Sequence, residues 1–355
     1  MKILHVLSQY EVNGAETYAA TLADECIRQG DSVSIVSDTF RTPTQANVVQ
    51  YPIGNRSYMQ RFRNIIFLHK YIEQHGIDVV HAHSRAASWV SYFATRQARV
   101  PLVSSIHMRQ HLHASSKLYS VYGEKLIAVC KAIYDHLRDE MHFPEDKLVV
   151  IPNGIDLSQW RFQPKSNHDG KKYVAVVGRF TGFKGDALVS FLNRVVSDLY
   201  KEYPEVEFHI VGGMSNKEKI GNIVKSINDQ LGEHCLFLDG FTTEVERVYH
   251  RADVVVGAGR VAMEALACGS PVVAMGESEV VGLITEKTAE RALYSNFGDL
   301  SPHVPFDSEK CIDALLSLLR KPEIFSPQWG RRFIEEQYDI RIIAQRIRKL
   351  YESFI

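Results

Sequence analysis

The chain has 355 residues, which is enough for about two domains of roughly 150 residues, each with its own buried core. Its 41 Lys and Arg side chains nearly balance its 42 Asp and Glu side chains, so the formal net charge is -1. That balance excludes a protein whose main task is to coat nucleic acid phosphates. A hydrophobic content of 45% with 23% charged residues also excludes a largely disordered chain.

The five cysteines are odd in number, scattered, and never arranged as C-x-x-C, which is typical of a reduced compartment. No apolar run approaches the roughly 18 residues that a membrane-spanning helix needs. The amino terminus passes from Met1 and Lys2 straight into a strand-like run with no cleavable signal. We therefore expect a soluble, cytoplasmic protein.

Short apolar runs alternate with helix-period segments along most of the chain, the pattern of parallel sheets built from βαβ units. In the first half we expect strands at 2–7, 32–37, 79–83, 102–107, 126–129 and 148–152. The first helix is expected over 15–28, with Glu16, Asp24 and Glu25 on its polar face and Gly30 at its end. The fold class is therefore α/β.

A second series of strands is expected at 173–178, 208–211, 236–238, 254–257 and 272–275, after a polar linker at 163–172. We therefore predict a first domain at 1–165 and a second at 166–336. A C-terminal helix at 337–355 is expected to cross back to the first domain. Both domains should be doubly wound and Rossmann-like, facing a central cleft with ligands at the carboxyl ends of the strands.

The strongest local signal follows the strand at 173–178, where Arg179 and Lys184 lie in a loop with glycines. Arg can fork onto two oxygens and Lys supplies a point charge, so this pair suits a diphosphate. Taken alone, the segment is equally consistent with a solvated turn. It lacks G-x-x-x-x-G-K-[ST] and is therefore not a P-loop.

A second signal runs from Gly257 through Gly259, Arg260 and Val261 to Glu264. A glycine-rich turn before a helix offers backbone N–H groups and the positive end of the helix dipole to an anion. A carboxylate one turn further along could accept hydrogen bonds from ribose hydroxyls. The alternative is a capping or surface glutamate.

The matching turn of the first half contains Gly14 but no G-x-G-x-x-G, which argues against a nicotinamide-binding site. Gly14 still permits close approach of the backbone to a ligand.

Together these segments resemble the successive motifs of the retaining GT-B glycosyltransferases of family four. The motifs occur in the family's order and span nearly the whole chain: Gly14-Ala15-Glu16, DVVHAH at 78–83, IPNGID at 151–156, Gly178-Arg179 with Lys184-Gly185, and EALACGSPVV at 264–273.

The resemblance implies roles for individual residues. Arg179 and Lys184 would hold the donor diphosphate and stabilise the departing charge, and Glu264 would bind the ribose. His107 would lie beside the transferred sugar, and Gly14 near the diphosphate. Gly257, Gly259, Arg260 and Val261 would complete the donor site.

One position departs from the family pattern. The family usually has a second glutamate, in contact with the donor sugar, eight residues before the one matching Glu264, and this chain has Val256 there. Arg260 either takes over part of that contact or is a surface arginine.

We predict no metal site and no cofactor. The chain contains no D-x-D, so cations and helix ends must stabilise the diphosphate. His81 and His83 share one strand face and could suggest zinc, but we expect no third ligand nearby, and the resemblance explains them as a packed strand end.

A run with several basic residues and no acidic residue extends from Val79 through Gly123. We assign Arg61, Arg63, Arg85 and Arg109 to the acceptor or membrane side. Such a run is either a solvated face or a docking surface for an anionic acceptor or an acidic membrane.

We therefore predict a retaining, metal-independent, hexosyltransferase-like enzyme that uses a UDP-, GDP- or ADP-sugar. Its acceptor is expected to be a glycan or lipid-linked molecule of bacterial lipopolysaccharide or envelope polysaccharide biosynthesis. Peripheral contact with the inner face of the plasma membrane stays open, and no nucleic acid partner is expected. The alternatives are a nucleotide-sugar 2-epimerase of the same fold and a non-catalytic nucleotide-sugar binding protein.

Overall fold

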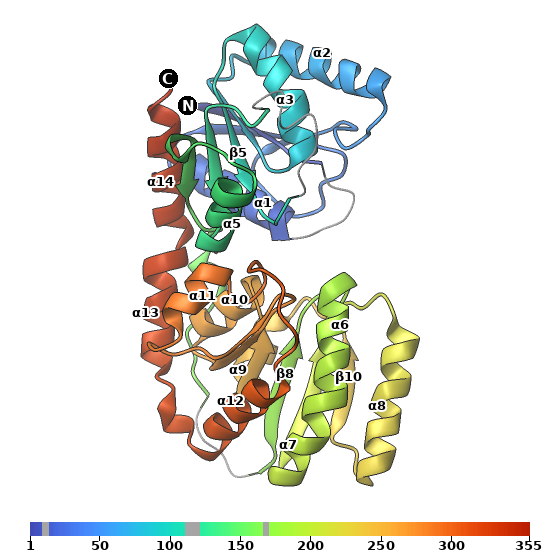
Figure 1. The fold of residues 1–355 in the computed structure, drawn as a ribbon. Helices are drawn as coiled ribbons and strands as arrows, with labels where there is room; N and C mark the ends of the chain where they lie inside the picture. The colour runs from blue at the N-terminus through green and yellow to red at the C-terminus, as the bar shows by residue number, and fades with distance from the viewer. Residues whose placement is uncertain (9–13, 111–120, 166–169) are drawn as a thin grey trace. The chain divides into compact units, whose positions relative to one another are not determined.

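The computed structural model describes residues 1–8, 14–110, 121–165 and 170–355. It contains two compact units, the first formed by Met1–Asp156 with Tyr338–Ile355 and the second by Leu157–Gln337 (Figure 1). Residues 157–165, which the sequence analysis placed in the first domain, lie in the second unit because their backbone bonds to it. Gln163 N donates to Cys268 O at 3.0 Å, and Arg161 N donates to Glu246 Oε1 at 2.7 Å.

The first unit is built on a parallel sheet with the strand order β3-β2-β1-β4-β5-β6-β7. Its strands are β1 Lys2–Val6, β2 Ser32–Ser37, β3 Asn47–Gln50, β4 Val79–Ala82, β5 Leu102–Ile106, β6 Lys125–Ala128 and β7 Leu148–Val150. Its helices are α1 Gly14–Arg28, α2 Tyr58–His75, α3 Arg85–Ala98, α5 Lys131–Asp135 and α14 Ile340–Glu352, with short turns η1 His136–Glu140 and η2 Glu145–Lys147.

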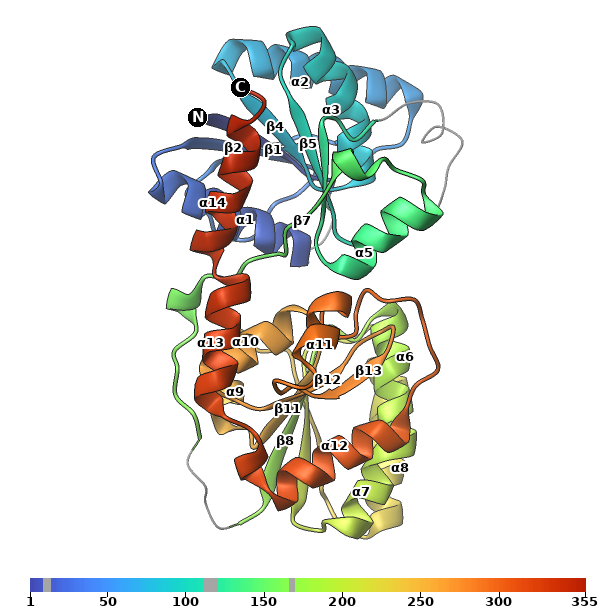
Figure 2. The ribbon, with the colours of Figure 1, turned by 60° about the vertical axis from the view of Figure 1, so that its left-hand side comes forward.

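The two faces of this sheet are covered by different helices (Figure 2). Ile3 and Val79 pack into a core that includes α1 and α14, whereas Leu4 and Val80 pack into a core that includes α2 and α3. Because side chains alternate along a strand, His5 and His81, two residues after Ile3 and Val79, also face α1 and α14. The predicted C-terminal helix is therefore α14, and it packs within the first unit.

The second unit is built on a six-stranded sheet with the order β10-β9-β8-β11-β12-β13, in which only the β12–β13 pair is antiparallel. Its strands are β8 Lys172–Val177, β9 Val206–Val211, β10 Leu236–Gly240, β11 Val254–Gly257, β12 Val272–Met275 and β13 Val280–Leu283. Its helices are α6 Gly182–Phe191, α7 Ser197–Glu202, α8 Lys217–Leu231, α9 Val245–Arg251, α10 Arg260–Cys268, α11 Ala289–Ser295, α12 Ser308–Arg320 and α13 Pro327–Tyr338, with short turns η3 Leu157–Gln159, η4 Leu192–Val196 and η5 Pro322–Ile324.

The expected polar face of the first helix is wrong at two positions, because Glu16 and Glu25 are buried. Glu16 Oε1 accepts hydrogen bonds from the backbone N–H groups of Arg41 and Thr42, both at 2.8 Å. This carboxylate therefore fixes the loop after β2 against α1. Among the residues that the structure describes, no helix is both long and apolar enough to cross a membrane.

Candidate functional site

Arg179 lies in the segment that joins β8 to α6 at the carboxyl edge of the second sheet, and Lys184, which was expected in the same loop, lies in α6 itself. The neighbouring strand ends there also approach closely, since a Cβ on Gly212 would meet Gly178 O at 1.8 Å. Lys184 is in the first turn of α6, where the helix dipole favours an anion. The two predicted phosphate-binding cations thus occupy one short strand–turn–helix segment.

Two acidic residues accompany these cations. The Lys184 ammonium donates to Asp299 Oδ2 at 2.7 Å, and Asp299 is only 8% exposed. Asp299 Oδ1 accepts from Glu277 N at 3.4 Å. Burial raises the pKa of the Glu277 carboxyl and Asp299 raises it further, while Lys184 and Arg179 act in the opposite direction.

The sequence motifs did not identify Glu277 or Asp299, because Asp299 is 115 residues from its partner Lys184. A signal that could have found them is the glycine pair Gly276 and Gly298. Their backbones approach so closely that a Cβ on Gly276 would meet Gly298 C at 2.1 Å. Gly276 directly precedes Glu277, and Gly298 directly precedes Asp299. A glycine before an acid at both positions indicates that the two backbones cross closely next to the two carboxyl groups.

Glu264 lies on α10 and is 7% exposed. Its Oε1 accepts from Arg260 Nε at 2.6 Å, and its Oε2 accepts from Tyr249 Oη–H at 3.0 Å. Burial raises the pKa of the Glu264 carboxyl, whereas Arg260 and Tyr249 lower it. Arg260 is therefore a partner of Glu264 and not an unattached surface arginine.

The turn before α10 depends on its glycines. Gly259 has φ +54, a conformation that most side chains disfavour, and a Cβ there would meet Asp299 Oδ2 at 2.6 Å. A Cβ on Gly257 would meet Val261 Cγ1 at 2.6 Å. The predicted donor residues Gly257, Gly259 and Val261 thus form a closely packed turn beside Asp299.

Val256, which occupies the position of the usual family glutamate, lies inside β11 and is fully buried. Its neighbours in the sheet are Val176 on β8 and Val273 on β12. No polar contact with a ligand is available from this position.

In the first unit, His107 follows β5, and Gly14 begins α1. His107 Nδ1 lies 3.2 Å from Asn153 Nδ2, and His107 Nε2 lies 3.4 Å from His83 Nδ1. Burial lowers the pKa of His107 to about 4, although Asn153 raises it. His107 is therefore neutral at physiological pH. Among the residues that the structure describes, none has an atom within 4 Å of a Cβ built on Gly14.

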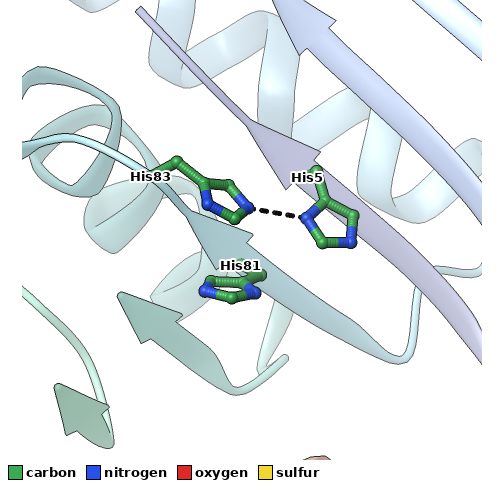
Figure 3. A group of neighbouring side chains, drawn as sticks. All are labelled: His5, His81 and His83. Carbon is green, nitrogen blue, oxygen red and sulfur yellow. Dashed lines mark hydrogen bonds between the residues drawn. The ribbon is translucent and has the colours of Figure 1, made fainter. Parts of the chain in front are cut away.

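His107 is next to His83 in a buried group of imidazoles, of which Figure 3 shows His5, His81 and His83. His83 Nε2 lies 2.7 Å from His5 Nδ1, and His81 bonds to the hydroxyls of Tyr351 at 2.6 Å and Ser105 at 2.7 Å. Burial lowers the pKa of His5 to about 3 and holds those of His81 and His83 well below their usual value.

The nitrogens of His5, His81 and His83 lie close enough for a metal ion, so the expectation that no third ligand is nearby is wrong. Both ring nitrogens of His81 and both of His83 already have hydrogen-bond partners. The 2.7 Å between His5 and His83 is itself a hydrogen-bond distance. The arrangement fits a hydrogen-bonded chain better than a set of ligands.

A second group of potential ligands is Glu246, His250 and Cys268. Glu246 and His250 bond to the backbone N–H and C=O of Arg161, and burial raises the pKa of the Cys268 thiol to about 12. Because metals bind thiolate, this group anchors residues 157–165 more readily than it binds an ion.

The four arginines assigned to the acceptor side differ in their surroundings. Arg61 lies over the Trp89 ring at 5.0 Å from its centroid, whereas Arg63 is exposed on α2. Arg85 begins α3 and hydrogen-bonds Tyr122.

Arg109 forms an ion pair with Glu140 on η1. The acid-free run in the sequence is therefore not acid-free in space. Part of that run, 111–120, lies outside the described residues.

One surface of α2 combines apolar and basic side chains, and we call it the α2 surface. Tyr58 is 86% exposed and Phe62 is 61% exposed, and Met59 and Ile66 are also exposed. The opposite side of α2 is buried through Asn64, Leu68, Tyr71 and Ile72. Arg63 and Lys70 are exposed on the same helix. The α2 surface is thus a candidate docking surface.

Comparisons with known proteins cover both halves of the chain. Residues 12–159 match the family model "Glycosyltransferase Family 4", and residues 171–320 match "Glycosyl transferases group 1". An uncharacterized glycosyltransferase of Methanocaldococcus jannaschii is 27% identical, over 80% of this chain and 82% of the relative. The alpha-monoglucosyldiacylglycerol synthase of Acholeplasma laidlawii is 24% identical, over 74% of this chain and 76% of that enzyme.

The solved structure of Anabaena HepE in complex with UDP-glucose has a TM-score of 0.70 at 18% identity, covering 99% of this chain and 100% of HepE. This likeness establishes the fold, and the two family matches lie on the two units that carry the predicted motifs. The chain therefore belongs to the retaining glycosyltransferases of family four and is a nucleotide-sugar-dependent enzyme with the GT-B fold.

Proposed function

We propose that this enzyme transfers a hexose from a UDP-, GDP- or ADP-sugar to a hydroxyl of a lipid-linked or anionic glycan acceptor. The enzyme would act in the synthesis of lipopolysaccharide or another envelope polysaccharide, at the inner face of the plasma membrane.

The donor assignment is supported by the second unit. Arg179, just before α6, and Lys184, in its first turn, supply two positive charges, and Glu264 supplies a buried carboxylate with lone pairs for ribose hydroxyls. As the bond to the sugar breaks, negative charge builds up on the diphosphate, and fixed cations stabilise it most strongly where water is excluded. Transfer in this proposal needs no divalent ion, because the two side chains provide the charge.

His107 retains the role that the family resemblance implies, contact with the transferred sugar. Its pKa of about 4 means that it is an uncharged hydrogen-bonding group at neutral pH. Its partners His83 and Asn153 fix the plane of the ring. We assign it to orienting the sugar and not to proton transfer.

The observation that carries the acceptor assignment is the α2 surface. A helix with exposed aromatic and aliphatic side chains beside basic ones binds the interface of an anionic membrane. The Acholeplasma relative is named for a glycolipid product, which agrees with an acceptor embedded in a membrane. Arg63 and Lys70 would contact lipid phosphates while Tyr58 and Phe62 enter the interface.

The test begins with a thermal-shift screen of UDP, GDP, ADP, CMP and their sugars. A ligand at a hundred times its dissociation constant stabilises by about 2.7 kcal/mol. The labelled sugar nucleotide that gives the largest shift is then incubated with the enzyme and a membrane extract. We expect label in the lipid fraction. Label confined to free sugar would contradict the acceptor assignment, and a screen with no shift would contradict the donor assignment.

A further inference from the structure

Asp299 holds a position in the second unit that neither the family motifs nor the proposed donor contacts use. Its carboxylate is 2.7 Å from the Lys184 ammonium, and the side chain is 9% exposed. The Lys184 side chain is about one third exposed. An anion that the Lys184 ammonium binds therefore lies close to the Asp299 carboxylate.

The turn at residues 257–261, which leads into α10, also packs against this carboxylate. Gly259 has no side chain, and a Cβ in its place would lie 2.6 Å from Asp299 Oδ2. Asn296 contributes a second polar group there, with its Nδ2 3.3 Å from the same Cβ position. The glycine keeps Asp299 next to the backbone of the turn that precedes α10.

A carboxylate in this position cannot serve a phosphate, because two negative charges repel at such distances. It can accept hydrogen bonds from hydroxyl groups, and hydrogen bonds to a charged acceptor are about twice as strong as neutral ones. A nucleoside diphosphate sugar presents hydroxyls on both sides of its diphosphate, on the ribose and on the sugar. Glu264 is already assigned to the ribose, which leaves the sugar for Asp299.

We propose that Asp299, held beside Lys184 by their ion pair, binds hydroxyl groups of the transferred sugar. This inference rests on the proposed nucleotide-sugar donor. It gives the chain a carboxylate for the sugar although position 256 is a buried valine. The neighbouring Glu277, whose backbone N–H donates to Asp299 Oδ1, keeps the carboxylate in this orientation.

The test compares Asp299→Asn with a matched control, Glu279→Gln. Glu279 is another buried acid close by in the chain, and it forms an ion pair with Arg291 at 2.8 Å instead of with a donor-site cation. Isothermal titration measures the affinity of the parent and both variants for three pairs of probes: UDP and UDP-glucose, GDP and GDP-mannose, ADP and ADP-glucose. The pair that the parent binds best is used for the comparison.

We expect Asp299→Asn to bind the nucleoside diphosphate at least as tightly as the parent, because a negative charge beside Lys184 has been removed. Its additional affinity for the sugar nucleotide should fall by about tenfold or more. Glu279→Gln should keep that additional affinity. If Asp299→Asn keeps the additional affinity for the sugar nucleotide, the inference is overturned. An equal loss of affinity for the nucleoside diphosphate and the sugar nucleotide would also overturn it, because Asp299 would then act only on Lys184 or the ribose.

These outcomes are distinguishable from failure of the proposed function, in which case the parent itself would bind none of the six probes. If Asp299→Asn does not fold, a crystal structure of the parent with the preferred sugar nucleotide decides the question. An Asp299 oxygen within hydrogen-bond distance of a sugar hydroxyl supports the inference, and a sugar that lies elsewhere overturns it.

Discussion

Arg260 Nε donates to Glu264 Oε1 at 2.6 Å across one turn of α10, while Tyr249 donates to the other carboxylate oxygen at 3.0 Å. The carboxylate of Glu264 is thus oriented before any ligand arrives. Each of its oxygens keeps a lone pair, so two ribose hydroxyls can be bound without rearrangement.

The first prediction concerns this carboxylate. Glu264→Gln should weaken binding of ribonucleotides by about tenfold or more, because charge-assisted hydrogen bonds to the ribose are lost. Titration calorimetry with the preferred nucleotide measures the effect, and the exposed Glu290→Gln is the control. The parent should already bind the 2'-deoxy nucleotide poorly. Equal affinity of the parent for ribo and deoxyribo forms would show that Glu264 does not serve the ribose.

The second prediction concerns the two cations. Arg179→Ala and Lys184→Ala should each weaken nucleoside diphosphate binding by about tenfold or more, since charged contacts contribute roughly 1.5 to 3 kcal/mol. Lys184→Ala should also lower the melting temperature, because it leaves Asp299 buried without its cation. Lys217→Ala, an exposed lysine of the same unit, should change neither.

The same samples test the requirement for a metal. Transfer in the presence of EDTA should match transfer with magnesium or manganese. Undiminished binding in both cation variants would refute the diphosphate site, and activity that depends on added divalent ions would refute metal-independent transfer.

The third prediction is acid sensitivity of the first unit. The pKa values of His5, His81, His83 and His107 are lowered by burial, to about 3 for His5 and about 4 for His107. Unfolded imidazoles bind protons near pH 6.5, whereas the folded ones remain neutral well below it. Above pH 6.5 the histidines are neutral in both states, and the free energy of unfolding is at its full value. As pH falls toward 4, protonation of the unfolded chain lowers the free energy of unfolding. Each histidine lowers the free energy of unfolding by about 1.4 kcal/mol per pH unit across that window.

Urea unfolding between pH 7.5 and pH 4.5 measures this slope. His81→Gln should reduce it, because one titrating group is removed. His142→Asn, an exposed histidine with φ +56 where asparagine is tolerated, should leave it unchanged. A free energy of unfolding that is flat from pH 6.5 to pH 4.5 would contradict the buried neutral state of these rings.

The fourth prediction concerns the α2 surface. Tyr58→Ser with Phe62→Ser should reduce binding to anionic vesicles and raise the apparent Michaelis constant for a lipid-linked acceptor. Arg63→Ser should mainly weaken the salt dependence of vesicle binding, because an exposed charge acts through a screened field. Flotation on sucrose gradients measures the first effect and its dependence on salt.

The control is Phe241→Ser, which removes an equally exposed aromatic side chain from the second unit. Nucleotide affinity should stay constant in all of these variants. If they lose donor affinity and keep vesicle binding, the membrane role of α2 is wrong.

The strands that the sequence identified best are those buried on both faces. Residues 254–257 and 272–275 agree with β11 and β12 because continuous apolar runs rich in Val are typical of central strands. β3 was missed because it is a partly exposed edge strand with polar ends. β13 was missed because Gly282 interrupts a run of only four residues.

The candidate site divides in the same way. Arg179, Lys184 and Glu264 could be predicted as candidates from the sequence because they lie in two local strand–turn–helix segments, after β8 and after β11. Asp299 could not, because its position depends on a tertiary contact with Lys184 across 115 residues. The burial of Glu16 escaped helical periodicity for the same reason, since its partners come from the loop after β2.

The packing of α14 determines when the first unit can be completed during synthesis. Ile340, Ile343, Ile347 and Tyr351 are buried in the same core as Ile3, and the Tyr351 hydroxyl bonds to His81 at 2.6 Å. A nascent chain that has reached only β7 therefore lacks one wall of that core. The second unit comes from one continuous stretch of sequence, Leu157–Gln337. The first unit therefore cannot complete its core until the whole of the second has been synthesised.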